Sequence, residues 1–159
     1  MKRAQFRISL AVVFMLLSSM LSIASADDAK EAAIKKDRQQ IAGTWRVVSL
    51  EVNGVKSSET EAKKITVMNG VDGSWVLRSE GNEIGQGTTT LDPTQSPKAI
   101  DIKSTTGPNQ DKAIPGIYKL EKNTRKLCFA QAGHTRPTEF SSTAANQQIL
   151  VTFERVKSE

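Results

Sequence analysis

Residues 43–54 read GTWRVVSLEVNG, and the character of the chain changes across this stretch. Before it, residues 28–41 are rich in Ala, Lys, Glu and Gln, which favour a helix, and Gly43 ends that helix. Asp28 and Glu31 have the spacing of a capping box at its start. Within 43–54, apolar and polar residues alternate up to a final Asn-Gly pair, which is typical of a strand that ends in a tight turn. The sequence therefore predicts a short helix followed by β-structure.

The rest of the chain predicts about eight strands, bounded by Gly, Pro, Asn and Asp. Residues 57–64 are polar and predict a loop or a helical turn, and a long polar loop ends at Pro115. Short links between successive strands favour an all-β, antiparallel up-and-down meander, and eight strands close into a barrel. The interior of such a barrel is either packed or holds one small ligand. The predicted strands are 44–52, 65–68, 74–80, 83–91, 98–103, 116–121, 125–130 and 147–157.

The N-terminus has the three parts of a secretory signal peptide. Lys2, Arg3 and Arg7 precede an uncharged, largely apolar stretch that ends in an A-x-A site at Ala26. An uncleaved membrane anchor is the alternative, but the serines and small residues of this stretch weaken it. We therefore expect a signal peptide at 1–26, a helix at 27–42 and a barrel at 43–159. The protein is expected to be exported to the periplasm, the cell envelope or the medium, with no stable membrane anchor after cleavage.

Charge and cysteine content narrow the function further. The chain has 159 residues, 22 basic and 17 acidic, and a formal net charge of +5. Three basic residues lie in the expected signal peptide, so 19 basic residues remain against 17 acidic ones and the mature charge is +2. This small mature charge and the lack of a cluster of Lys and Arg residues in the sequence argue against nucleic acid as a partner. Cys128 is the single cysteine, so no internal disulfide is available, and its apolar surroundings predict a buried thiol.

Trp45 and Arg155 stand in the first and last predicted strands, which are neighbours in a closed barrel. A guanidinium over an indole face is a favourable contact, worth about 0.5–2 kcal/mol. Gly43, Trp45 and Arg155 together resemble the structural signature of lipocalins, a G-x-W at the first strand with a late arginine packed over the tryptophan. The role that this resemblance implies is structural.

A wider resemblance covers nearly the whole mature chain. Its most specific strings are SPKAIDI at 96–102 and RPTEF at 136–140, beside the G-x-W at 43–45. The combination is similar to a lipocalin-like domain family of uncharacterised function that is abundant in planctomycete bacteria. This resemblance implies a bacterial exported β-barrel and no known activity.

Residues that could carry catalysis are sparse. His134 is the only histidine and lies in a predicted loop, and with Cys128 it cannot form an ordinary zinc site. No phosphate-binding loop or dinucleotide fingerprint is present. We therefore expect no enzyme, no metal and no cofactor. Arg136 and Glu139 either line the barrel mouth or form a local ion pair over Phe140, which would then plug the barrel.

Two functions remain after these exclusions. The first is an exported barrel that binds a small apolar or amphipathic ligand. The alternative is a filled barrel that acts as an interaction module of the cell envelope through its long loops, with an unknown protein partner. Alternation along the strands gives the candidate ligand-lining residues as Trp75, Leu77, Ile100, Ile102, Tyr118, Phe129 and Val151.

Overall fold

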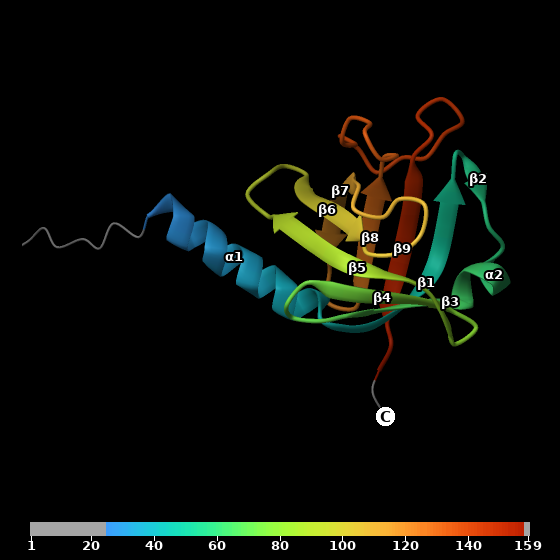
Figure 1. Ribbon diagram of the computed structural model, residues 1–159, viewed down its shortest axis with the longest axis horizontal. Helices are drawn as coiled ribbons and strands as arrows, with labels where there is room; N and C mark the ends of the chain where they lie inside the picture. Colours follow the sequence, from blue (N-terminus) through green and yellow to red (C-terminus); the bar gives the residue numbers. More distant parts are fainter. Residues whose placement is uncertain (1–24, 158–159) are drawn as a thin grey trace, which may run out of the picture.

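From Gly43 onward the chain winds into a closed antiparallel β-barrel, with a helix attached at one end (Figure 1). The structure is a computed structural model and describes residues 25–157. The helices are α1 (Ala26–Ile41) and α2 (Glu59–Lys63). The strands are β1 (Gly43–Val52), β2 (Val55–Lys56), β3 (Ile65–Asn69), β4 (Ser74–Ser79), β5 (Asn82–Asp92), β6 (Lys98–Ser104), β7 (Ala113–Leu120), β8 (Thr124–Phe129) and β9 (Ile149–Arg155).

Eight of the strands pair in chain order, and the first and last of them close the ring. The order is β1-β3-β4-β5-β6-β7-β8-β9, with β1 also paired to β9 along a register that runs from Trp45–Arg155 to Val52–Ile149. β2 only extends β1 as a short hairpin arm. The predicted eight-stranded antiparallel up-and-down barrel, preceded by a short helix, is therefore confirmed. Each barrel strand has a neighbour on both sides.

The two ends of the barrel differ. We call the end where β1 begins and β9 finishes the base, and the opposite end, where β1 finishes, the mouth. α1 leads directly into β1 and lies against the base (Figure 1). Its buried Asp37 accepts hydrogen bonds from Lys98 Nζ and from the Tyr118 hydroxyl, each at 2.7 Å. The helix is therefore fastened to the base through a buried carboxylate.

α1 begins earlier than the sequence predicted. The helix covers 26–41 rather than 27–42, and its N-cap is Ser25, whose hydroxyl accepts from the backbone N–H of Asp28. The Asp28 carboxylate in turn accepts from the backbone N–H of Ser25, which completes a capping box one turn before the predicted pair of Asp28 and Glu31. Serine at the cap satisfies the orphan N–H groups of the first turn. Of the predicted signal peptide, 1–24 lies outside the described residues.

Of the two alternatives predicted for residues 57–64, a loop or a helical turn, the structure has the helical turn, α2, which buries Ala62 against the barrel. The start of β7 differs from the prediction. β7 begins at Ala113, whereas the sequence predicted a start after Pro115. Proline can join a strand where its missing N–H is not needed, and the Pro115 carbonyl still accepts from the N–H of Ala130 at 2.9 Å.

The base is held by a contact between the first and last strands. Trp45 is fully buried, and the Arg155 guanidinium lies 4.2 Å from the centre of its ring. Arg155 also donates to the carbonyls of Ala42, at 2.8 Å, and Gln40. The indole N–H of Trp45 donates to the carbonyl of Ile41 at 2.7 Å. These bonds join β1, β9 and the end of α1, whose last carbonyls have no partners within the helix.

Substituting Arg155 tests this contact. Arg155→Ala removes the stacking and the charged hydrogen bonds, and we expect the free energy of unfolding to fall by about 2–4 kcal/mol. Arg46→Ala, on the exposed side of β1, is the matched control and is expected to change it by less than about 0.5 kcal/mol. Urea unfolding followed by circular dichroism measures both. Equal, small losses would show that the base is held by other contacts.

Candidate functional site

The barrel interior holds a predominantly apolar cavity of about 250 Å³ that is partly open to solvent. This is larger than a cavity of about 150 Å³ that stays dry and binds benzene in another protein. The interior is therefore not completely filled by side chains. The lining residues are Ile41, Val47, Leu50, Ile65, Val67, Asn69, Trp75, Leu77, Thr89, Ile100, Ile102, Arg125, Leu127, Phe129, Ile149, Val151 and Phe153.

Glycines in β5 leave room for the largest of these side chains. Trp75 is paired with Gly87, and Leu77 with Gly85, so both glycines face the same side as the indole. A Cβ on Gly85 would lie 3.6 Å from the Trp75 ring. A Cβ on Gly87 would lie 2.8 Å from that ring and would overlap the Lys103 carbonyl oxygen. The indole therefore rests against the bare backbone of β5.

Six of the seven predicted lining residues border the cavity, and Tyr118 does not. The Tyr118 side chain points inward at the base, where its hydroxyl bonds to Asp37 of α1. Burial and the neighbouring carboxylate raise the pKa of Tyr118 well above its usual value. Alternation predicted the inward direction but not the carboxylate from the helix that occupies its hydroxyl. The six that border the cavity are Trp75, Leu77, Ile100, Ile102, Phe129 and Val151.

Two buried polar side chains in the lining were missed by the sequence analysis. Asn69 is 9% exposed and Arg125 is 4% exposed. Arg125 lies between two rings, with its guanidinium carbon 4.9 Å from the centre of Trp45 and 4.6 Å from that of Phe153. Burial, and then the nearby charge of Arg155, lower the pKa of Arg125 to about 9, so it stays charged at neutral pH. Alternation could have found Arg125, since it stands two residues before an inward leucine.

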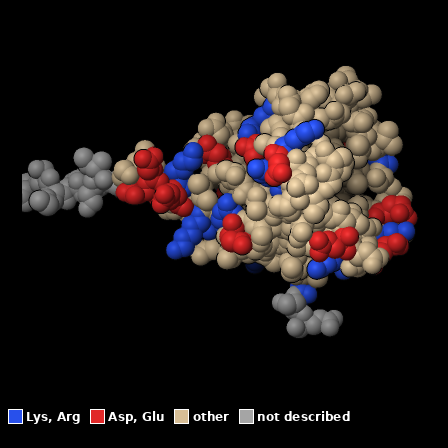
Figure 2. All heavy atoms as spheres, viewed as in Figure 1, with Lys and Arg blue, Asp and Glu red and all other residues tan. Residues whose placement is uncertain are grey.

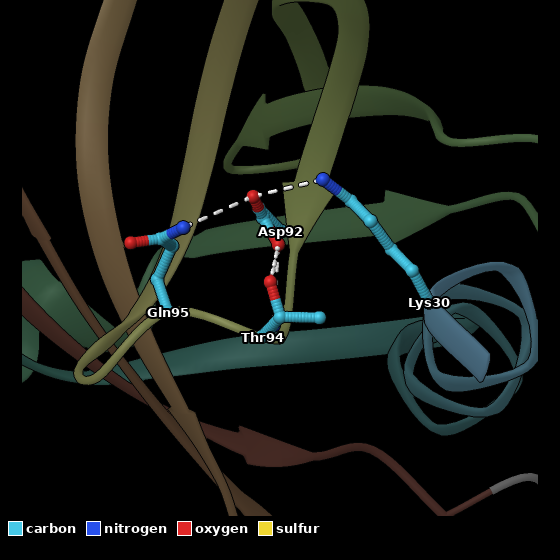
Figure 3. Close-up of polar contacts among 4 residues, drawn as sticks. All are labelled: Lys30, Asp92, Thr94 and Gln95. Carbon is cyan, nitrogen blue, oxygen red and sulfur yellow. Dashed lines mark hydrogen bonds and ion pairs between the residues drawn. The ribbon is translucent and has the colours of Figure 1, made fainter. Parts of the chain in front are cut away.

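A second hollow, of about 600 Å³, lies outside the barrel beside α1. Figure 3 shows its polar corner, where the Asp92 carboxylate accepts from Lys30 Nζ at 3.0 Å and from the Thr94 hydroxyl at 2.6 Å. Gln95 donates to the same carboxylate at 3.4 Å. The Thr94 and Lys30 contacts hold the pKa of Asp92 below its usual range. Because these partners already occupy Asp92, the corner is a structural link between α1 and β5.

The RPTEF string lies outside the cavity. Arg136 donates to the carbonyls of Ile100, at 2.8 Å, and Gly116, at 2.7 Å, and pairs with Asp101 at 2.8 Å. Arg136 therefore fastens the loop 130–148 to the outer face of the barrel. Neither predicted arrangement of this string is present.

Phe140 of the RPTEF string does not plug the barrel. It lines a separate surface hollow of about 310 Å³ and is absent from the cavity lining. Arg136, which was expected to pair with Glu139, is instead engaged by Asp101. The side chains of Arg136 and Phe140 therefore both lie against the outer face of the barrel.

The two residues with nucleophile or base chemistry lie apart from the cavity lining. Cys128 is buried under the loop 130–148, where its thiol donates to the Ser141 carbonyl at 3.3 Å, and burial raises its pKa. His134 is exposed. Within residues 25–157, no group of three or more His, Cys, Asp or Glu side chains is placed to hold a metal ion. No helix in the same range is long and apolar enough to cross a bilayer.

Charge is unevenly distributed over the surface. Figure 2 shows acidic and basic side chains gathered along α1, while the uppermost part of the view is mostly uncharged. The loop 130–148, at the mouth, carries only two charged residues, Arg136 and Glu139. The mouth is bordered by exposed apolar side chains, among them Val52, Val55 and Ile149.

The fold and the cavity define a closed β-barrel with a hollow apolar interior and a helix against its base. No family model matches the chain, and no curated protein matches it. Among solved structures, the chain is similar to a DUF4847 family protein from Bacteroides vulgatus, with 12% identity and a TM-score of 0.45. The match covers 78% of this chain and 99% of the other.

The two glycines of β5 give a matched pair of substitutions. Gly87→Ala forces the strand away from the Lys103 carbonyl, and we expect a loss of about 1–3 kcal/mol in the free energy of unfolding. Gly85→Ala meets only ordinary van der Waals contact and should change it by less than about 1 kcal/mol. Urea unfolding followed by tryptophan fluorescence separates the two. Similar losses for both would contradict the close approach of the Gly87 backbone to the Lys103 carbonyl.

Tyr118 is the only tyrosine, so its ionisation can be followed by absorbance. In the unfolded chain it ionises near pH 10, but the folded protein keeps its proton above that pH. The contribution of Tyr118 to stability is therefore constant below about pH 10 and is lost as the pH rises further. We expect the tyrosinate signal to appear together with loss of the circular dichroism signal. Tyr118→Phe should abolish the absorbance step, whereas a step near pH 10 in a fully folded protein would contradict the buried contact.

Proposed function

We propose that this protein is an exported, lipocalin-like binding protein that takes a small apolar or amphipathic molecule into its barrel. The observation that carries the proposal is the cavity of about 250 Å³ with its predominantly apolar lining. Burying apolar surface contributes roughly 25 cal/mol per Å², and a concave apolar lining buries most of the surface of a small ligand. Export is proposed from the signal-peptide pattern of 1–26 alone.

The size of the cavity limits the ligand. With about 30 Å³ for each water molecule in the liquid, its volume corresponds to roughly eight water-sized groups. Ligand pockets for drug-sized molecules are usually about 300–1,000 Å³, so this cavity suits a smaller compound. The alternative function, an interaction module of the cell envelope, predicts a barrel filled with side chains. A cavity of this size therefore favours the binding protein over the interaction module.

Filling the cavity tests the proposal. Ile102 faces the cavity from β6, while the next residue, Lys103, is exposed. We expect octan-1-ol to bind the purified protein at one site, because its chain removes apolar surface from water on entering the cavity. Ile102→Trp should weaken this binding about tenfold or more by occupying the space, and Lys103→Trp should leave it unchanged. Isothermal titration calorimetry measures both.

Two outcomes would contradict the proposed function. One is the absence of saturable octan-1-ol binding to the wild-type protein, after circular dichroism has established that it is folded. The other is equal weakening by Ile102→Trp and Lys103→Trp, which would place the bound alcohol on the surface of the barrel.

A further inference from the structure

The polar atoms of the cavity lining are unusual because two of them are buried without an acceptor. Arg125 Nε and Asn69 Nδ2 make no hydrogen bond to any group in residues 25–157. Both residues line the cavity and both are more than nine-tenths buried. Buried donors are nearly always paired, because leaving one unpaired costs its full desolvation penalty. Each of these two unpaired donors therefore indicates a place where a ligand can accept a hydrogen bond.

The charge on Arg125 is not balanced by any carboxylate among the described residues. None of the ion pairs within 25–157 includes Arg125. Its charged neighbour is another cation, Arg155, and the rings of Trp45 and Phe153 occupy the space around it. Cation–π contacts offset part of the cost of burial, but they accept no N–H from the guanidinium edge. An anion in the cavity would supply both the charge and the acceptor.

These donors lie toward one end of the cavity. Asn69 is the last residue of β3 and Arg125 the second residue of β8, and both strands have these ends at the base. The lining contributed by strand ends at the mouth is apolar throughout. It consists of Leu50, Ile65, Leu77, Ile102, Phe129 and Ile149. The cavity is therefore cationic at its base end and apolar toward the mouth.

From this arrangement we infer that the ligand is a medium-chain carboxylate, bound with its carboxylate on Arg125 and its hydrocarbon chain directed toward the mouth. Asn69 Nδ2 is the second hydrogen-bond donor at the base end of the cavity. A chain of about six to eight carbons matches the volume of the cavity. A planar guanidinium suits a carboxylate because two parallel N–H···O bonds can form. The inference rests on the proposed function and adds the chemical class of the head group.

Octanoate and octan-1-ol form the test, since they have the same chain and differ in the charged head group. In water the carboxylate is the better solvated of the two, so an apolar cavity alone would prefer the alcohol. We expect the wild-type protein to bind octanoate at least about tenfold more tightly than octan-1-ol, measured by isothermal titration calorimetry at pH 7. This comparison needs no variant and is independent of any folding defect.

Variants then assign the preference to Arg125. Arg125→Met should lower octanoate affinity about tenfold or more while octan-1-ol affinity stays within about threefold. Arg125→Lys keeps the charge and should retain the preference for octanoate. Arg46→Met, on the exposed side of β1, is the matched control and should change neither affinity. Circular dichroism establishes that each variant is folded.

The outcomes separate the inference from the function on which it rests. If octan-1-ol binds as tightly as octanoate, the carboxylate assignment is wrong while the apolar binding function stands. If neither compound binds, both fail. If Arg125→Met weakens both compounds equally, Arg125 only supports the fold and the head-group assignment is overturned. Should Arg125→Met not fold, Asn69→Ala is the second variant, and it should weaken octanoate more than octan-1-ol. Octanoate affinity unchanged by Asn69→Ala would then overturn the placement of the carboxylate at the base end of the cavity.

Discussion

The structure depends on the contact that closes the barrel between β1 and β9. Arg155 stacks on Trp45 and bonds to the last carbonyls before β1, so one side chain holds the first strand, the last strand and the end of α1. Without this closure the sheet would have two open edges and no enclosed interior. The helix could not seal the base either, because its attachment through Asp37 needs β6 and β7 in their places. The closed sheet, the attachment of the helix at the base and the cavity therefore all depend on the contact that joins β1 to β9.

One side of the barrel interior presents bare backbone to the side chain opposite it. At Gly85 and Gly87, β5 contributes no side chain, and the Trp75 indole lies in the space that they leave. Protein interiors are usually packed to the density of organic crystals, so a hollow of about 250 Å³ forgoes dispersion contacts that smaller voids would keep. Arg125, which is buried and has no anionic partner within residues 25–157, adds a second cost. Both departures from good packing occur in the same place.

Local patterns in the sequence were sufficient for the barrel and for most of its lining. Alternation identifies the inward residues of each strand, and the positions of Trp45 and Arg155 near the chain ends predict their meeting once the ring is closed. What the patterns could not supply is long-range chemistry. Tyr118 faces inward as alternation requires, yet its hydroxyl is taken by Asp37 from a helix 81 residues away. Arg125 was passed over because a charged residue in an apolar strand is usually assigned to the surface.

The closing contact also determines how the chain must fold. Arg155 and Ala42, which share a hydrogen bond across the base, are separated by 113 residues. Contacts between such distant residues require the loss of much chain entropy before they contribute stability, and barrels dominated by them fold in milliseconds to seconds. Until β9 is in place, β1 and β8 each present unpaired N–H and C=O groups that can pair with another chain. Completion of the ring at the last strand therefore removes these two edges as sites at which another chain can pair.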